Sequence, residues 1–206
     1  MRSIKLGFLA SGRGTNMQSI IDACKTGSLN AVPAVVISNN AGSMALERAG
    51  KEHIPAVHLS SRMFTDEDEL DKRITETLRQ HGVELVVLAG YMKKLGPGTL
   101  TAYAGRVINV HPALLPRFGG QGMYGDNIHR AVLAAGETET GVTIHIVEDK
   151  YDSGPILAQR TVRVEPGDSV ETLRNRVLTV EHELYVETIG DILEGKIKLP
   201  NNVLRS

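Results

Sequence analysis

Asn109 and His111 stand two positions apart in VINVHPALLP, a stretch over residues 107–116 that is otherwise apolar. Side chains alternate along a strand, so a strand here would place both polar groups on one face of a sheet. Pro112 keeps His111 extended and ends the hydrogen-bonded ladder, so the pair lies at the carboxyl end of the strand, where α/β sheets bind ligands. An amide and an imidazole suit a carbonyl reaction, because both can donate to a developing oxyanion. The alternative is an asparagine that caps a turn and a histidine satisfied within the core.

A carboxylate that could act with this pair lies in EDKYDSGPI, residues 148–156. Asp152 is followed by Ser-Gly-Pro, a turn that fixes the backbone. Near His111, its charge would favour the imidazolium form and therefore raise the pKa of the imidazole. It could also orient the ring and position a water molecule. The alternative is an Asx-turn, which is a usual role of aspartate in such a sequence.

The glycine-rich stretch SGRGTN, residues 11–16, follows the first apolar run. A loop between a strand and a helix presents backbone N–H groups and a helix N-terminus, both suited to phosphate. Met17 stands where a dinucleotide fingerprint has its third glycine, and the second strand ends in ISNN without an acidic residue. We therefore expect a monophosphate rather than NAD or ATP, which disfavours an NAD-dependent oxidoreductase. The alternative is a tight turn in which Thr15 or Asn16 caps the helix.

Apolar runs alternate with amphipathic stretches along the chain, a pattern typical of a parallel sheet with crossover helices. The two late β segments alternate polar and apolar residues, which indicates antiparallel strands. The expected fold is therefore α/β and Rossmann-like, with three layers, a mostly parallel twisted sheet, antiparallel strands in the C-terminal part and helices on both faces. Strands are predicted at 4–10, 32–38, 56–59, 84–90, 106–111, 140–148 and 155–164, helices at 15–27, 43–53, 66–82, 129–136 and 169–195, and a partly loose tail at 196–206.

Composition excludes several classes of protein. The net charge is -1 and no polybasic run occurs, so a nucleic-acid surface is not expected. Cys24 is the only cysteine and no His-x-His or His-x-x-x-His pair occurs, so neither an internal disulfide nor a metal site is expected. No segment has the 18 or so apolar residues of a membrane helix, and the first apolar run is too short for a signal peptide. A cytoplasmic protein is expected.

Three motifs occur together in the order S-G-x-G-T-N, N-x-H-P-A-L-L-P and Y-D-S-G-P-I. They resemble the folate-dependent formyltransferase family over residues 4–195, and the glycine loop is most similar to the branch that acts on glycinamide ribonucleotide. The resemblance implies transfer of a formyl group from 10-formyltetrahydrofolate, the co-substrate, to the amine of glycinamide ribonucleotide, a step of purine biosynthesis. Asn109 and protonated His111 would stabilise the negative oxygen of a tetrahedral intermediate. Asp152 would keep His111 charged and help to move a proton to the folate nitrogen.

The resemblance also implies which residues form the site. The catalytic residues are expected to be Asn109, His111 and Asp152. Ribonucleotide contacts are expected at the glycine loop, and at an acidic residue that holds the ribose hydroxyls: Gly14, Thr15, Asn16 and Glu181. Formylfolate contacts are expected in LAGYMKKL, in the central motif and in the aspartate loop: Leu88, Tyr91, Met92, Lys93, Lys94, Leu95, Asn109, Glu148, Asp149, Lys150, Tyr151 and Asp152. No metal is implied.

A single formyltransferase domain is expected over residues 1–206. Residues 1–110 would form the phosphate- and nucleotide-binding half, and residues 111–206 the folate-binding half with the catalytic loop. The expected partners are the two small-molecule substrates, and the chain is expected to be a monomer or a homodimer. The glycine-rich insertion at 119–127 has no assigned role. The alternatives are another formylfolate enzyme, such as a formyltetrahydrofolate hydrolase or a sugar-amine formyltransferase, and a non-catalytic nucleotide-binding module.

Overall fold

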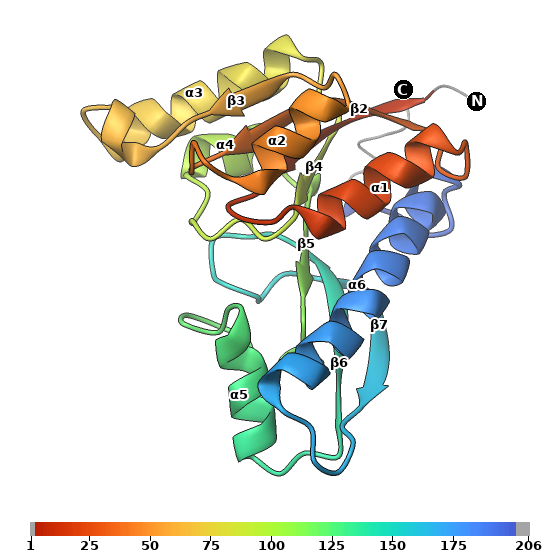
Figure 1. Ribbon diagram of the computed structural model, residues 1–206. Coiled ribbons are helices and arrows are strands. Elements are labelled where there is room, and N and C mark those ends of the chain that lie inside the picture. Colours follow the sequence, from red (N-terminus) through yellow and green to blue (C-terminus); the bar gives the residue numbers. More distant parts are fainter. Residues whose placement is uncertain (1–2, 201–206) are drawn as a thin grey trace.

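A computed structural model describes residues 3–200 of the chain. Its centre is a seven-stranded sheet in the order β3-β2-β1-β4-β5-β6-β7 (Figure 1). The first five strands are parallel: β1 (Ile4–Leu9), β2 (Ala31–Ser38), β3 (Ala56–His58), β4 (Leu85–Leu88) and β5 (Val107–His111). The last two run antiparallel: β6 (Glu139–Ile146) and β7 (Ile156–Arg163). The predicted α/β class and mixed sheet are confirmed.

Helices cover both faces of the sheet. They are α1 (Thr15–Lys25), α2 (Met44–Lys51), α3 (Glu67–Gln80), α4 (Pro97–Ala102), α5 (Asp126–Ala134) and α6 (Val170–Leu193), with a 3₁₀ turn η1 (Ser61–Met63). Residues of α1, α2, α5 and α6 share one buried cluster, and residues of α3 share another. Along β4, Val87 belongs to the first cluster and Val86 to the second, so the strand is buried on both faces. Burial on both faces explains why this strand is continuously apolar.

Helices α3 and α6 begin where the sequence supplies an N-cap side chain. The side chain of Asp66 accepts a hydrogen bond from the Glu69 N–H at the start of α3. Ser169 and Thr172 form a capping box at the start of α6. Helix α5 begins at Asp126, three positions before its predicted start at 129, directly after Gly125. The predicted loose tail is described only to residue 200, and residues 201–206 lie outside the described part.

Helix α4 was not predicted, because its sequence PGTLTA has no apolar period. Its N-terminus is stabilised from another helix. The carboxylate of Asp71, on α3, accepts hydrogen bonds from the backbone N–H groups of Gly98 at 2.7 Å and Thr99 at 3.0 Å. This cap comes from 27 positions away along the chain, so local sequence gives no sign of it.

Gly154 lies in the aspartate loop, residues 148–156, and its surroundings leave no room for a side chain. A Cβ atom at this position would overlap the carbonyl oxygen of Ile146. We expect Gly154→Ala to lower the free energy of unfolding by about 2–3 kcal/mol, because a backbone carbonyl cannot move aside as a flexible side chain can. The matched control is Gly50→Ala, in α2, where a Cβ would meet nothing within 4 Å. Urea denaturation of both variants measures the difference; equal stability of Gly154→Ala and wild type would contradict the expectation.

Candidate active site

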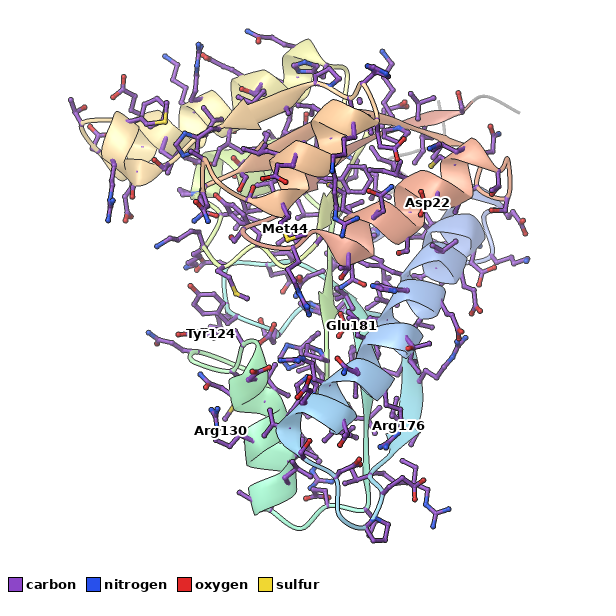
Figure 2. All side chains as sticks on the ribbon, in the orientation of Figure 1. Asp22, Met44, Tyr124, Arg130, Arg176 and Glu181 are labelled. Atoms are coloured by element: carbon purple, nitrogen blue, oxygen red, sulfur yellow. The ribbon has the colours of Figure 1, made fainter. Side chains whose placement is uncertain are left out.

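A cavity of about 860 Å³ lies at the carboxyl ends of β1, β4 and β5. This volume lies within the range typical of small-molecule sites. Every residue predicted for the site lines the cavity except Asp149, whose side chain is 85% exposed. Tyr124, on the loop ahead of α5, and Glu181, on α6, lie on two different sides of it (Figure 2). The motifs that are far apart in the sequence therefore meet in one place.

Asp152 lies between two histidines. Its Oδ1 is 3.6 Å from Nδ1 of His111 and 3.5 Å from Nε2 of His145. Its Oδ2 accepts a hydrogen bond of 2.9 Å from the backbone N–H of Gly120. These partners are distant along the chain, so the carboxylate does not form the local Asx-turn that was the alternative. The backbone of Asp152 is left-handed, with φ 53°, a conformation that aspartate tolerates better than most residues.

The carboxyl of Asp152 is ionised near neutral pH. Burial on its own raises the pKa of this group. The hydrogen bond from His145 and the charge of His111, each present when that ring is protonated, act in the opposite direction together with the Gly120 N–H and lower the pKa below its ordinary value. A carboxylate is therefore present beside both imidazoles.

Asp152 raises the pKa of His111, as expected, but it is not the largest effect on this group. The ring is buried, and burial lowers its pKa by more than Asp152 and the Phe118 carbonyl raise it. The imidazole is therefore mostly neutral near neutral pH, and Asp152 does not hold it in the charged form. Nε2 lies 2.8 Å from the carbonyl oxygen of Phe118, so the neutral ring carries its hydrogen there. This tautomer leaves Nδ1 without a proton, facing Asp152.

His145 lines the cavity, although it lies in none of the three sequence motifs. Its Nδ1 lies 2.9 Å from the carbonyl oxygen of Ile146, to which it donates. In the neutral ring Nε2 then accepts a hydrogen bond of 3.2 Å from the Nδ2 amide of Asn109. This bond uses one of the two amide hydrogens of Asn109 and fixes the orientation of the amide group. The signal that would have found His145 is the register of β5 and β6, in which Asn109 is directly opposite His145.

The glycine-rich segment at 119–127 contacts the predicted catalytic residues directly or through its neighbour Phe118. His111 donates to Phe118 immediately before it, and Gly120 within it donates to Asp152. Gly120, Gly122 and Gly125 have positive φ angles, a conformation that glycine adopts without strain. The segment is thus both part of the cavity wall and a support for two of the predicted catalytic side chains.

The glycine loop ends at the N-terminus of α1. Gly14, with φ 66°, is the N-cap residue, and no side chain caps the helix, so the alternative of a Thr15 or Asn16 cap is wrong. The first backbone N–H groups of α1 are therefore available to an anion. The side chain of Asn16 does not cap α1; its Nδ2 donates a hydrogen bond of 2.6 Å to Glu181 on α6. Burial raises the pKa of Glu181, and the Asn16 hydrogen bond only partly offsets this effect.

Residues 89–95 form the wall between the glycine loop and the aspartate loop. The Met92 N–H donates a 2.7 Å hydrogen bond to Oγ of Ser11. Nζ of Lys94 lies 2.7 Å from Oδ1 of Asp149, so an ion pair joins this segment to the aspartate loop. Burial raises the pKa of Tyr91 to about 12, so its hydroxyl keeps its proton. The two segments predicted to bind formylfolate therefore lie on adjoining sides of the cavity.

Residues 3–200 contain no group of three or more histidine, cysteine, aspartate or glutamate side chains placed to hold a metal ion. None of the helices in this range is long and apolar enough to cross a membrane.

The fold and the site together define an α/β enzyme that acts on a carbonyl group at the carboxyl ends of parallel strands. The chain belongs to the formyl transferase family, whose model matches residues 4–189. The resemblance seen in the three motifs is thereby confirmed. The roles of the individual site residues are not tested by family membership and stay predictions.

Two relatives and one solved structure show how far the similarity extends. The chain is 41% identical over 198 residues to the chloroplastic phosphoribosylglycinamide formyltransferase of Arabidopsis thaliana, which covers 96% of this chain and 68% of that protein. It is 38% identical to phosphoribosylglycinamide formyltransferase of Haemophilus influenzae, covering 97% of this chain and 92% of that one. Glycinamide ribonucleotide transformylase 1 from Symbiobacterium toebii has a TM-score of 0.90 at 39% identity, covering 97% of this chain and 92% of that structure.

Proposed function

We propose that this chain transfers the formyl group of 10-formyltetrahydrofolate to the amine of glycinamide ribonucleotide, a step of purine biosynthesis. The observation that carries the proposal is a single cavity of about 860 Å³ lined by three groups of residues. They are the uncapped start of α1, the segment 89–95 and the cluster of Asn109, His111 and Asp152. The relatives that share almost the whole chain bear the name of this activity.

The ribonucleotide fits the side of the cavity formed by α1 and α6. The backbone N–H groups of Thr15 and Asn16 and the dipole of α1 bind the phosphate. Glu181 accepts hydrogen bonds from the ribose hydroxyls, and the hydrogen bond from Asn16 holds its carboxyl group in place. This arrangement puts the amine of the substrate on the side of the catalytic cluster.

The folate fits the opposite side, between residues 89–95 and the aspartate loop. Leu88 and Leu95 supply apolar surface, and backbone groups beside them supply hydrogen-bond donors and acceptors for a heterocycle. When bound there, 10-formyltetrahydrofolate supplies the formyl carbon that the amine attacks.

The catalytic cluster then provides a donor and a proton acceptor. Asn109 donates its second amide hydrogen to the carbonyl oxygen as negative charge develops on it. His111, neutral in the resting site, accepts a proton from the attacking amine at Nδ1. Asp152, 3.6 Å from that nitrogen, stabilises the imidazolium that results. The same imidazolium can return the proton to the departing nitrogen.

One assay tests the proposal. The protein is mixed with glycinamide ribonucleotide and a 10-formylfolate donor, and deformylated folate is followed by absorbance. We expect its release to depend on the ribonucleotide. Equal release without the ribonucleotide would identify a hydrolase instead, and release only with an amino sugar would identify a sugar-amine formyltransferase. A folded protein that binds the ribonucleotide but releases no folate would be the non-catalytic module.

The two small-molecule substrates are the partners that this function requires. The cytoplasmic location, the choice between monomer and homodimer, and the division into a nucleotide-binding half at 1–110 and a folate-binding half at 111–206 stay predictions. Sedimentation of the purified chain with and without substrates tests the oligomeric state.

A further inference from the structure

Tyr185 is a fully buried side chain on α6 whose hydroxyl contacts two neighbouring strands. Its oxygen lies 3.1 Å from the carbonyl oxygen of Leu88 and 3.0 Å from that of Ile108. Burial, and then the charge of Glu181, raise its pKa, so the hydroxyl keeps its proton and donates. A phenol has one hydrogen, so this hydrogen is shared between the two carbonyls or alternates between them.

One carbonyl lies at the end of β4, and the other lies within β5 beside Asn109. Leu88 is the last residue of β4, directly ahead of the segment 89–95. Ile108 immediately precedes Asn109 in β5, and Leu88 pairs with Asn109 in the parallel register. The Tyr185 hydroxyl therefore joins the strand that leads into the proposed folate segment to the strand that carries the amide.

The same face of α6 contacts the other side of the cavity. Glu181 lies one helical turn before Tyr185, so the two side chains project in nearly the same direction. Glu181 accepts the hydrogen bond from Asn16 at the start of α1, and its place on α6 is shown in Figure 2. One turn of helix thus contacts the proposed ribonucleotide site through Glu181, and the end of β4 and the Ile108 carbonyl of β5 through Tyr185.

We propose that Tyr185 is a positioning residue that holds Asn109 and the folate segment at a fixed distance from the Glu181-bound ribonucleotide. This inference rests on the proposed function. It adds that helix α6 sets the distance between the residues that contact the two substrates. Rate depends steeply on such spacing, because small misplacements of reacting groups lower the fraction of productive encounters.

The test is Tyr185→Phe, which removes one oxygen atom and keeps the ring. We expect kcat to fall about fivefold, the factor that corresponds to one typical intramolecular hydrogen bond. We also expect KM for the formylfolate to rise, because the end of β4 loses a partner. KM for the ribonucleotide is expected to stay unchanged, because the Asn16–Glu181 hydrogen bond is intact. Rates are measured at a temperature below the thermal unfolding midpoint of each variant. They are expressed per ribonucleotide-binding site counted by calorimetry, so that partial unfolding does not mimic a loss of turnover.

The matched control is Thr188→Val on the same helix. Thr188 is buried, and its hydroxyl donates a 2.6 Å hydrogen bond to the Leu184 carbonyl within α6 rather than to a strand. It is expected to lower the unfolding midpoint without changing kcat or either KM. Wild-type kinetics in Tyr185→Phe, or an equal fall of kcat in Thr188→Val, would overturn the positioning role while leaving the proposed function intact. Absence of ribonucleotide-dependent transfer in the wild type would overturn both.

Discussion

Replacing His111 with alanine is expected to lower kcat roughly 10²- to 10³-fold, the loss typical of removing one group that stabilises charge in the transition state. The reason is geometric: Nδ1 of His111 lies 3.6 Å from Oδ1 of Asp152, and Nε2 donates a hydrogen bond to the Phe118 carbonyl that fixes the ring. Without the ring, the amine loses the imidazole that accepts its proton in the proposed mechanism, and Asp152 has no His111 imidazolium to stabilise. Steady-state kinetics with glycinamide ribonucleotide and a formylfolate donor measure the effect.

A second buried histidine provides the control for this experiment. His129, on α5, also lines the cavity and is as buried as His111, but it has no ion pair with Asp152. His129→Ala should therefore lose stability by a similar mechanism and keep most of its turnover. Near-normal turnover in a folded His111→Ala protein would show that the histidine is structural.

Changing Asp152 to asparagine is expected to lower kcat roughly 10²- to 10⁴-fold, the range of general acid–base contributions. Asparagine keeps the size of the side chain and can still accept the hydrogen bond from Gly120, so the loss reports the missing charge. The charge of Asp152 raises the pKa of His111 against the larger effect of burial, so its removal lowers that pKa further.

The pH profile of the Asp152→Asn variant identifies the active form of His111. If the neutral imidazole is active, activity is lost as the pH falls through its pKa, and the acid limb of kcat/KM moves to lower pH in the variant. If the imidazolium is active, as the sequence suggested, the basic limb moves to lower pH instead. We expect the first result. Asp149→Asn is the control, because Asp149 lies in the same loop but its exposed side chain does not line the cavity, and the pH positions of both limbs should match those of the wild type.

The fold was largely predictable because its elements carry local signals. Strands such as β4 are buried on both faces and therefore read as continuous apolar runs. Helix α3 has an N-cap aspartate and an acidic first turn. Helix α4 carried no such signal, because its cap is Asp71 on another helix.

The sequence predicted those site residues that lie at or directly after the carboxyl end of a parallel strand. The glycine loop follows β1, and Asn109 and His111 end β5, so a parallel sheet brings them to one edge. His145 could not be placed because its contact with Asn109 depends on the antiparallel register of two strands. The pKa of His111 could not be predicted because its burial depends on the packing of the whole cavity wall, and burial is the larger effect.

The contacts made by Phe118 and Gly120 have a consequence for how this enzyme could diverge. Both backbone contacts to His111 and Asp152 come from these two positions, and both positions have positive φ angles that restrict which residues can replace them. Residues 121–125 carry neither support, yet Gln121 and Tyr124 border the opening of the cavity. Substitutions there can reshape the rim, and with it the choice of acceptor amine, while the chemistry of proton transfer is conserved.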